Sequence, residues 1–413
     1  MSDSKLPAGW SEKPLGALVS FQKGRKTDTS KNALNGYARY LGASGLSGKD
    51  DGFADMAGAV IAEPSDLLML WDGERSGLVG YMQQGVVAST VSRLTPTDEI
   101  DSAYLYYKLV SLFDWIQARR TGTGVPHVPK DLGKILDIIY PKDTSVQRNI
   151  ATILRTIDNQ IDATQALIEK YTAIKQGMMA DLFSRGIDPE TKALRPTFEE
   201  APELYQETPL GMLPKGWDVS DLGSISLRVT DGSHQAVSTV ENGDIPFLFV
   251  SCVRGGKILW DKCSYVSKED YHLISKGREP RKGDILYTAV GSYGHAALVS
   301  EDSEFSFQRH IAYIKPNNQF VDSSFLSEFL NSEQTKSWAD KVALGNAQKT
   351  VTLGELSKFP IVLPGKIEQE NIVDSLQAIN EVLESEYASL SKLQQTKQGL
   401  MQDLLTGKVS VPA

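Results

Sequence analysis

The residues of this chain best suited to chemistry are basic and amide side chains in glycine-rich stretches. Lys23, Arg25 and Lys26 surround Gly24, and Arg309 precedes His310. Arg, Lys, Asn, Gln, Ser and His side chains supply the hydrogen bonds with which proteins hold phosphates and read base edges. Taken singly, each such residue is more often an ordinary solvated side chain, but their clustering in loops favours contact with nucleic acid.

Two sets of these residues, one in each half of the chain, are predicted to contact DNA. The first set is Lys23, Arg25, Lys26, Arg39, Tyr40, Arg75, Arg119, Arg120, Thr121 and Thr123. The second set is Ser233, His234, Gln235, Arg254, Lys257, Ser292, Tyr293, His295, Gln308, Arg309, His310, Asn346, Gln348 and Lys349. A further basic cluster, outside both sets, contains Arg278, Arg281 and Lys282. With 43 basic and 52 acidic residues the net charge is −9, so local clusters must provide any contact with phosphates.

Patterns for catalysis and for metal binding are missing or incomplete. The chain has no [DN]PP[YF] tetrapeptide and no Walker A loop, and Gly122-Thr123-Gly124 lacks the third glycine of a dinucleotide-binding loop. The five histidines are scattered, and the two cysteines form no CxxC motif. Asp181 with Glu190-Thr191-Lys192 superficially resembles a metal-nuclease motif, but it falls across a helix end and a proline-rich segment. We therefore expect no catalytic residue and no metal ligand.

The elements that would position these residues come from a unit that is written twice. Leu6-Pro7-Ala8-Gly9-Trp10 returns as Leu213-Pro214-Lys215-Gly216-Trp217. Residues 146–185, set against 368–407, give 13 identities in 40 positions, including a repeated Lys-Gln-Gly. Each half therefore consists of one globular segment followed by one long segment.

Both long segments are predicted to be helices that pair with each other. Their apolar residues follow an alternating spacing of four and three, the period of a coiled coil. The seam positions are Ile150, Leu154, Ile157, Ile161, Thr164, Ile168 and Tyr171, and Ile372, Leu376, Ile379, Leu383, Glu386, Leu390 and Leu393. The alternative is an amphipathic helix packed on its own domain, but 40 residues span about 60 Å, more than the width of such a domain.

Closing two copies of one unit on each other makes a pseudo-twofold, which would run the helices antiparallel. Thr164 and Glu386 share one seam position and would either fix the register or face solvent. Gly177 and Gly399 interrupt the helical pattern in both copies. They suggest a close backbone approach, the alternative being a tolerated local flaw.

We predict two α+β domains joined by two long antiparallel coiled-coil helices. Strands are expected at 64–70 and 282–288, helices around 102–117 and 323–341, and closing strands at 138–141 and 361–364. The predicted boundaries are 1–143 for the first domain, 144–185 for the first helix, 186–212 for a linker, 213–365 for the second domain, 366–407 for the second helix and 408–413 for a tail. No apolar run is long enough to span a membrane and no signal peptide is visible, so we expect a cytoplasmic protein.

This combination resembles the specificity subunit of type I restriction-modification systems. The specific part is the duplicated helix end, Lys-Gln-Gly-(Met/Leu)-Met-x-Asp-Leu, at Lys175–Leu182 and Lys397–Leu404, and LPxGW opens each domain. The first domain departs from the pattern, with Ser65-Asp66-Leu67-Leu68 where the second has Gly283-Asp284-Ile285-Leu286. It also has Ala88-Ser89-Thr90 in place of Gln308-Arg309-His310, so base contacts do not transfer position by position.

The resemblance implies that each domain is a target recognition domain that reads one half of a bipartite DNA site in the major groove. The helices would set the separation of the halves and dock two methyltransferase subunits, which use S-adenosylmethionine. Two restriction subunits would add ATP- and Mg²⁺-dependent translocation and cleavage, and this chain would bind no cofactor and catalyse nothing. The expected docking residues are Lys175, Gln176, Gly177, Met178, Lys397, Gln398, Gly399 and Leu400.

Two alternatives stay open at this point. A self-sufficient DNA-modifying enzyme would change DNA when purified alone with metal or S-adenosylmethionine. A coiled-coil scaffold without DNA specificity would give no sequence-selective protection of DNA. The unlike loops of the two domains favour DNA specificity, because a symmetric scaffold needs no two different readers.

Overall fold

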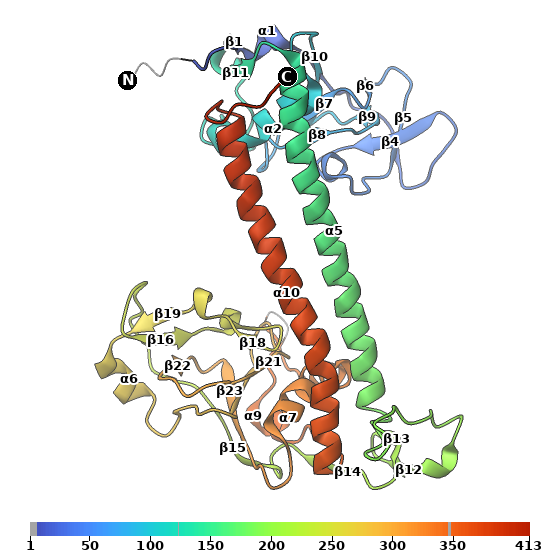
Figure 1. Cartoon of the computed structure of the whole chain (residues 1–413), viewed down its shortest axis with the longest axis vertical. Coiled ribbons are helices and arrows are strands. Elements are labelled where there is room, and N and C mark those ends of the chain that lie inside the picture. The colour runs from blue at the N-terminus through green and yellow to red at the C-terminus, as the bar shows by residue number, and fades with distance from the viewer. Residues whose placement is uncertain (1–5, 123, 346–347) are drawn as a thin grey trace. The chain divides into compact units, whose positions relative to one another are not determined.

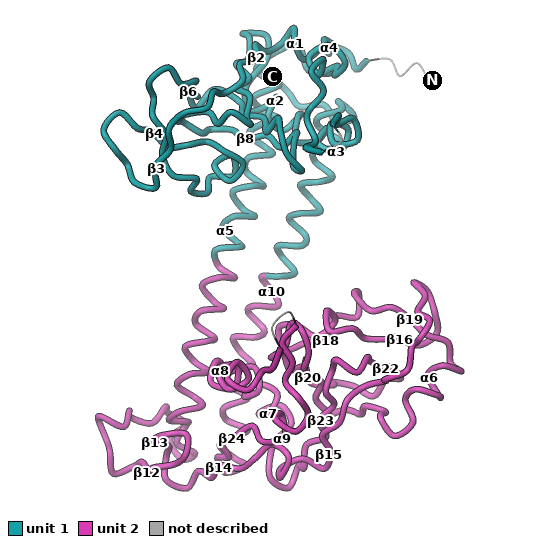
Figure 2. Tube along the Cα trace, turned by 180° about the vertical axis from the view of Figure 1, so that it is seen from behind, with its two compact units in different colours: residues 1–166, 387–413 teal, residues 167–386 magenta. Residues whose placement is uncertain are grey.

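The computed structural model describes residues 6–122, 124–345 and 348–413, which form two compact units (Figures 1 and 2). Unit 1 comprises Met1–Ala166 and Tyr387–Ala413, and unit 2 comprises Leu167–Glu386. Each unit contains one α+β domain together with parts of two long helices, α5 (Thr144–Leu182) and α10 (Lys366–Leu404). Both predicted helices are therefore confirmed, and each has 39 residues.

The long helices follow from their sequence. Neither contains proline, and Asp143 begins α5 by accepting a hydrogen bond from the Ser145 amide at 2.8 Å. A glycine with positive φ follows each helix, Gly186 at +62° and Gly407 at +73°. Within unit 1 the first part of α5 lies beside the last part of α10, and the two run in opposite directions (Figure 1).

The predicted seam of apolar residues faces inward in both units. Ile150 and Leu154 are buried against the domain of unit 1, and Ile372 and Leu376 against that of unit 2. At the polar seam position Thr164 is buried, whereas Glu386 is half-buried. Burying these stripes stabilises the helices more than helix propensity could alone.

The domain of unit 1 is built on a four-stranded antiparallel sheet with the order β2-β10-β7-β8. A second sheet has the order β3-β5-β4-β9-β6, and β1 pairs with β11. The strands are β1 (Trp10–Pro14), β2 (Val19–Lys23), β3 (Thr29–Ser30), β4 (Tyr37–Leu41), β5 (Phe53–Asp55), β6 (Ile61–Ala62), β7 (Leu67–Leu70), β8 (Val79–Tyr81), β9 (Gly85–Val87), β10 (Val91–Pro96) and β11 (Asp137–Pro141). The short helices are α1 (Leu15–Leu18), α2 (Ser102–Ser111), α3 (Phe113–Gln117) and α4 (Leu132–Ile135).

The domain of unit 2 repeats this topology with the sheet β15-β23-β20-β21. Its second sheet is shorter, β19-β16-β22, with separate pairs β17-β18, β14-β24 and β12-β13. The strands are β12 (Tyr205–Thr208), β13 (Gly211–Pro214), β14 (Asp218–Asp221), β15 (Ser226–Asp231), β16 (Ile245–Leu248), β17 (Val253–Arg254), β18 (Lys257–Ile258), β19 (Ser264–Val266), β20 (Ile285–Thr288), β21 (Ala296–Leu298), β22 (Ser306–Phe307), β23 (Ile311–Pro316) and β24 (Pro360–Leu363). The helices are α6 (Lys268–Ile274), α7 (Ser323–Leu330), α8 (Glu333–Val342) and α9 (Leu353–Ser357).

One buried glutamine joins the start of each long helix to its own domain. Gln147 accepts a hydrogen bond from the Asp101 amide at 2.6 Å and donates to the Pro141 carbonyl at 2.7 Å. Gln369 does the same with the Asp322 amide at 2.7 Å and the Pro364 carbonyl at 2.8 Å. The sequence repeat is therefore also a repeat of contacts.

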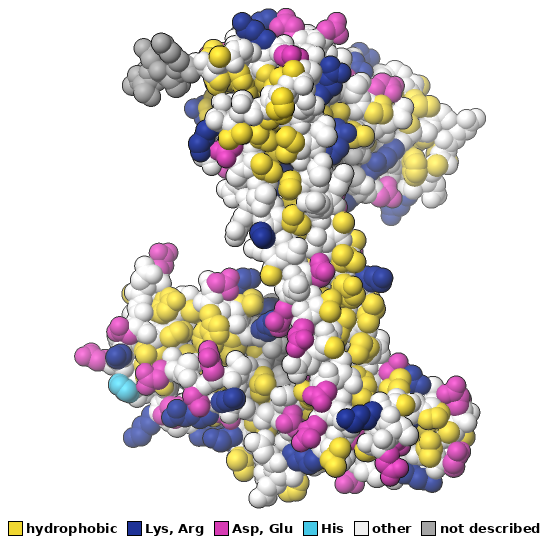
Figure 3. Space-filling model, viewed as in Figure 1, with side chains coloured by type: hydrophobic (Ala, Val, Ile, Leu, Met, Phe, Trp, Pro, Cys, Tyr) yellow, Lys and Arg dark blue, Asp and Glu magenta, His cyan; other side chains and the backbone are white. Residues whose placement is uncertain are grey.

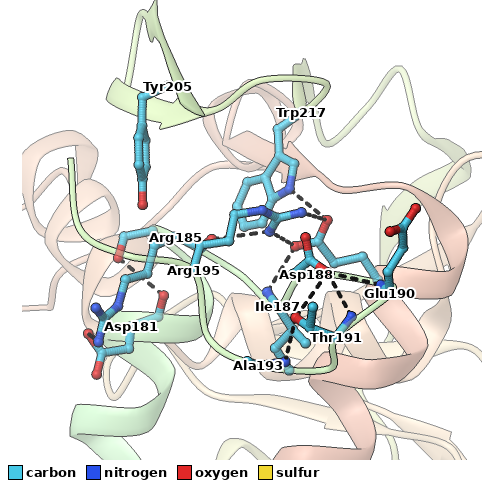
Figure 4. A network of polar contacts seen from close by, with 12 residues as sticks. Asp181, Arg185, Ile187, Asp188, Glu190, Thr191, Ala193, Arg195, Tyr205 and Trp217 are labelled. Carbon is cyan, nitrogen blue, oxygen red and sulfur yellow. Dashed lines mark hydrogen bonds and ion pairs between the residues drawn. The ribbon is translucent and has the colours of Figure 1, made fainter. Parts of the chain in front are cut away.

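The segment predicted as a linker is folded onto unit 2 (Figure 4). The Arg195 guanidinium holds the buried Glu368 carboxylate with two hydrogen bonds, one of them 3.0 Å long. Trp217, the last residue of the second LPxGW motif, donates its indole N–H to the same carboxylate at 3.0 Å, and so does the Ile187 amide. Because Val146 stands at the position of Glu368 in the first repeat, unit 1 has no counterpart of this carboxylate.

The close backbone approach predicted at Gly177 and Gly399 is wrong. A β-carbon built at either glycine meets no atom of the described residues within 4 Å. Both glycines lie on exposed faces of their helices. The alternative, a locally tolerated glycine, therefore describes the packing of this chain.

Candidate nucleic-acid interface

Four loops meet at one end of the four-stranded sheet in unit 1, and we call them loop cluster 1. They comprise residues 23–26 at the end of β2, 71–75 after β7, 88–90 before β10 and the hairpin in which Thr121 pairs with His127, described over 121–122 and 124–127. Backbone hydrogen bonds hold them together: Gly24 N–H to Val91 O at 2.9 Å, Trp71 N–H to Thr90 O at 2.8 Å and Gly73 N–H to Pro126 O at 2.9 Å. Predicted DNA contacts from distant parts of the sequence are thus brought side by side.

The equivalent loops of unit 2 form loop cluster 2. They comprise residues 231–235 at the end of β15, 290–295 after β20, 308–310 before β23 and the hairpin in which Leu344 pairs with Thr350, described over 344–345 and 348–350. The corresponding bonds run from Gly232 N–H to Ile311 O at 3.2 Å, from Ala289 N–H to His310 O at 2.9 Å and from Gly291 N–H to Lys349 O at 2.8 Å. The two clusters therefore share one backbone frame.

The glycines explain why this frame recurs. Gly122 has φ +101° and Gly345 has φ +103°, so each opens its hairpin in a conformation that disfavours other residues. A β-carbon at Gly24 or Gly232 would lie 2.1 or 2.2 Å from the carbonyl oxygen of Ala88 or Phe307. Only glycine lets the loops pack this closely.

The side chains on the two frames differ. In loop cluster 1 the Asp72 carboxylate accepts a hydrogen bond from Lys23 Nζ at 2.8 Å and lies 2.7 Å from His127 Nδ1. Burial would raise the pKa of Asp72, but the bonds from Lys23 and His127 outweigh it, so the pKa is lowered. An open depression of about 850 Å³ next to this triad is lined by Phe21, Trp71, Lys23, Lys130 and Lys134, among others.

Loop cluster 2 carries amides and histidines instead. His234 pairs with Asp231 at 2.7 Å, and Gln235, Arg309, Gln348 and Lys349 are exposed. Partial burial lowers the pKa of His310, and the positive charge of the neighbouring Arg309 lowers it further. Burial also lowers the pKa of His295, helped by Arg254 and Lys336. Both imidazoles are therefore neutral at pH 7 and can donate or accept hydrogen bonds.

Some predicted contacts lie outside the clusters or are occupied within the chain. Arg39 on β4 binds Gln83 at 3.0 Å, and Lys257 pairs with Glu384 of α10. Arg119 lies over the Trp115 ring, and Arg120 donates to the Glu74 carbonyl at 2.6 Å, which braces the loop 71–75. Thr123 and Asn346 lie outside the described residues. No comparison tests individual contacts, and the two sets stay predictions.

Sequence reasoning missed three residues of these clusters. Trp71, Asp72 and His127 belong to cluster 1 but stand apart from its basic residues in the sequence. The sequence repeat was the signal that could have indicated them. Val128 and Val351 follow equivalent hairpins, and their amides donate to equivalent carbonyls, Trp71 O at 2.9 Å and Ala289 O at 2.8 Å.

Of the eight residues predicted to dock partner subunits, four make contacts within their own units and four are exposed. Lys175 lies 3.0 Å from Glu328 of α7, and Lys397 lies 2.5 Å from Asp158, so both bind within their own units. Met178 and Leu400 pack on the cores of units 2 and 1. The exposed members are Gln176, Gly177, Gln398 and Gly399. Docking at these helix ends stays a prediction.

Neither a membrane-spanning helix nor a metal-binding cluster occurs among the described residues. None of their helices is both long and apolar enough to cross a bilayer. No three of their His, Cys, Asp or Glu side chains are grouped so that they could hold a metal ion.

Comparison with known proteins decides the family. The model of the type I restriction-modification DNA specificity domain matches residues 7–172 and again residues 214–395. This chain is a type I restriction-modification specificity subunit. The specificity subunit of the MjaVIII enzyme from Methanocaldococcus jannaschii is 27% identical over 100% of this chain and 95% of its own. That of EcoBI from Escherichia coli is 25% identical over 76% of this chain and 67% of its own.

Solved structures agree on the fold of this specificity subunit. The type I S subunit from M. genitalium has a TM-score of 0.61 at 17% identity and covers 97% of both chains. A chain from a study of complex assembly and conformational transition of a type I system has a TM-score of 0.53 at 16% identity and covers 98% of this chain. The predicted fold class, with its two repeats and paired long helices, is confirmed.

Proposed function

We propose that each unit of this specificity subunit reads one half of a bipartite DNA target through its loop cluster. The observation that carries the proposal is one backbone frame with two different sets of side chains. A shared frame presents both loop clusters to a duplex in the same way, and unlike side chains allow the two half-sites to differ.

The remaining steps of the reaction belong, in this proposal, to partner subunits. Two methyltransferase subunits dock on the duplicated helix ends and methylate adenine with S-adenosylmethionine. Two restriction subunits use ATP and Mg²⁺ for translocation and cleavage. The specificity subunit supplies no catalytic group, and its acidic total charge suits a complex whose other subunits also contact phosphates.

Binding selection with a variant of one cluster tests this proposal. The chain is purified with its methyltransferase partner, and the bound sequences are selected from random duplexes. Replacing Gln308, Arg309 and His310 by alanine should relax one half-site only, with about 10- to 100-fold lost discrimination for each base pair that is no longer read.

The matched control is Lys358→Ala, which removes an exposed cation outside the clusters and should leave selection unchanged. Relaxation of both halves together, or of neither, would contradict the assignment of one half-site to each unit. DNA modification by the chain alone would instead support the self-sufficient enzyme.

A further inference from the structure

A second basic surface lies on unit 2, at the end of the sheet opposite loop cluster 2. We define the basic edge as Arg228 of β15, Lys276, Arg278, Arg281 and Lys282 of the segment before β20, and Lys315 of β23. Figure 3 shows dark-blue side chains gathered along one edge of unit 2. Strands β15, β20 and β23 run between this edge and the loop cluster.

Named contacts bring these cations together. The Arg228 guanidinium donates to the Gly277 carbonyl, and Arg228 stands directly opposite Lys315 in the pairing of β15 with β23. Arg281, Lys282 and Lys315 line one open depression of about 450 Å³. Arg228, Arg281, Lys282 and Lys315 therefore share one surface, and the Gly277 carbonyl places the segment 276–278 beside it.

The cations of the basic edge have no acidic partners among the described residues. No carboxylate oxygen there lies within 4 Å of their side-chain nitrogens. The nearby carboxylates bind backbone amides instead: Glu279 that of Gly277 at 3.0 Å, Asp284 that of Arg281 at 2.8 Å and Asp302 that of Lys282 at 2.9 Å.

Repulsion among these cations destabilises the protein when nothing is bound to the basic edge. Like charges directly opposite each other on neighbouring strands are destabilising, and Arg228 faces Lys315. The chain has an excess of acidic residues, with a net charge of −9, yet none of those described forms an ion pair with Arg228 or Lys315. Because no carboxylate of the described residues relieves this repulsion, a bound polyanion would stabilise the surface by neutralising its charges.

The described residues of unit 1 form no equivalent surface at the corresponding strand ends. At the corresponding strand ends Ser20 faces Thr95. Glu63 and Pro64 stand where unit 2 has Arg281 and Lys282, because β7 and β20 begin at equivalent points. An external polyanion would therefore be bound by unit 2 alone.

We infer that the basic edge binds the sugar-phosphate backbone of duplex DNA that flanks the half-site read by unit 2. The inference rests on the proposed function. β15 has six residues, about 20 Å, which corresponds to about six base pairs. Because the bases are not read there, the contact is independent of the flanking sequence and extends the protected DNA on one side.

The test uses the complex with its methyltransferase partner and duplexes that are shortened from each end in turn. Removing flanking DNA at one end only should weaken binding about tenfold, and the other end should not matter. In the variant Arg281→Gln/Lys282→Gln this dependence should disappear, and the slope of log K against log salt should become shallower by about 2.

The matched control is Lys215→Gln/Lys358→Gln, which removes the same charge from exposed sites of unit 2 outside the edge. Equal thermal unfolding of the variants excludes misfolding, because the Arg281 and Lys282 side chains hold no carboxylate in the described structure. An unchanged salt slope and end dependence in the Arg281/Lys282 variant would overturn the inference.

Two other outcomes are distinguishable from this one. If the variant binds DNA normally but no longer co-purifies with its partner, the basic edge binds an acidic protein surface and the inference is wrong. If the wild-type complex shows no sequence-selective binding at all, the proposed function fails. Selective binding that ignores both flanks overturns only this inference.

Discussion

At the scale of residues, a buried lysine of unit 1 binds the backbone just after the end of α10. Lys108 on α2 is buried and donates to the Leu405 carbonyl at 2.8 Å, beside the end of α10. Phe329 takes the equivalent place on α7 in unit 2, where it packs edge-on against Phe183. The end of α10 is therefore held by a hydrogen bond in unit 1, and the equivalent end of α5 by aromatic packing in unit 2.

Lys108 should make stability depend on pH. Burial lowers its pKa to about 8, from 10.5 when exposed. Between these values the unfolded chain binds more protons, so the free energy of unfolding should rise with pH across the window, by up to about 3 kcal/mol. Lys108→Met should abolish this part of the rise, measured as the difference between the two proteins in urea unfolding from pH 7.5 to 9.5. A constant difference over that range would contradict the assignment.

The sequence revealed the loop residues only in part. Lys23 and Arg25 are visible as basic residues around a glycine, and the structure puts them in loop cluster 1. Asp72 and His127 could not be paired, because a contact across 55 positions depends on how the strands are ordered. The predicted docking residues Lys175 and Lys397 are bound by carboxylates in their own units, which the sequence pattern alone did not indicate.

At the scale of elements, the repeated period of the seam was enough to predict both long helices. The folding of the segment 186–212 was not predictable in this way, because it depends on Glu368, a residue from the start of α10. Proline and acidic residues indicated a linker, yet Arg195 and the Ile187 amide bind Glu368 and fix this segment to the helix.

Replacing Gln369 by leucine should destabilise the attachment of α10 to unit 2. The Asp322 amide and the Pro364 and Phe320 carbonyls would lose their partners, at a cost of about 2–4 kcal/mol. Chemical denaturation measures the loss, and Gln395→Leu, on an exposed face of the same helix, is the control. A cost below about 0.5 kcal/mol would show that the glutamine does not anchor the helix.

At the scale of the whole molecule, the paired helices are proposed to set the separation of the half-sites. Deleting residues 163–169 together with the equivalent residues 385–391 removes one heptad from each helix and preserves the seam. Seven residues correspond to about 10 Å, so the preferred spacer should shorten by about three base pairs. Selection from duplexes with spacers of graded length measures this. An unchanged preference in an active complex would contradict a ruler role.

This specificity subunit is proposed to choose the DNA sequence that its complex modifies. The most direct test of this proposal is single-molecule sequencing of methylated adenines in cells with and without the gene, where the methyltransferase partner is expressed. We predict that deletion removes one two-part motif and that restoring the gene returns it. The variant in which alanine replaces Gln308, Arg309 and His310 should restore only one half of that motif. An unchanged pattern of methylated adenine after deletion, with the partner active, would contradict the account.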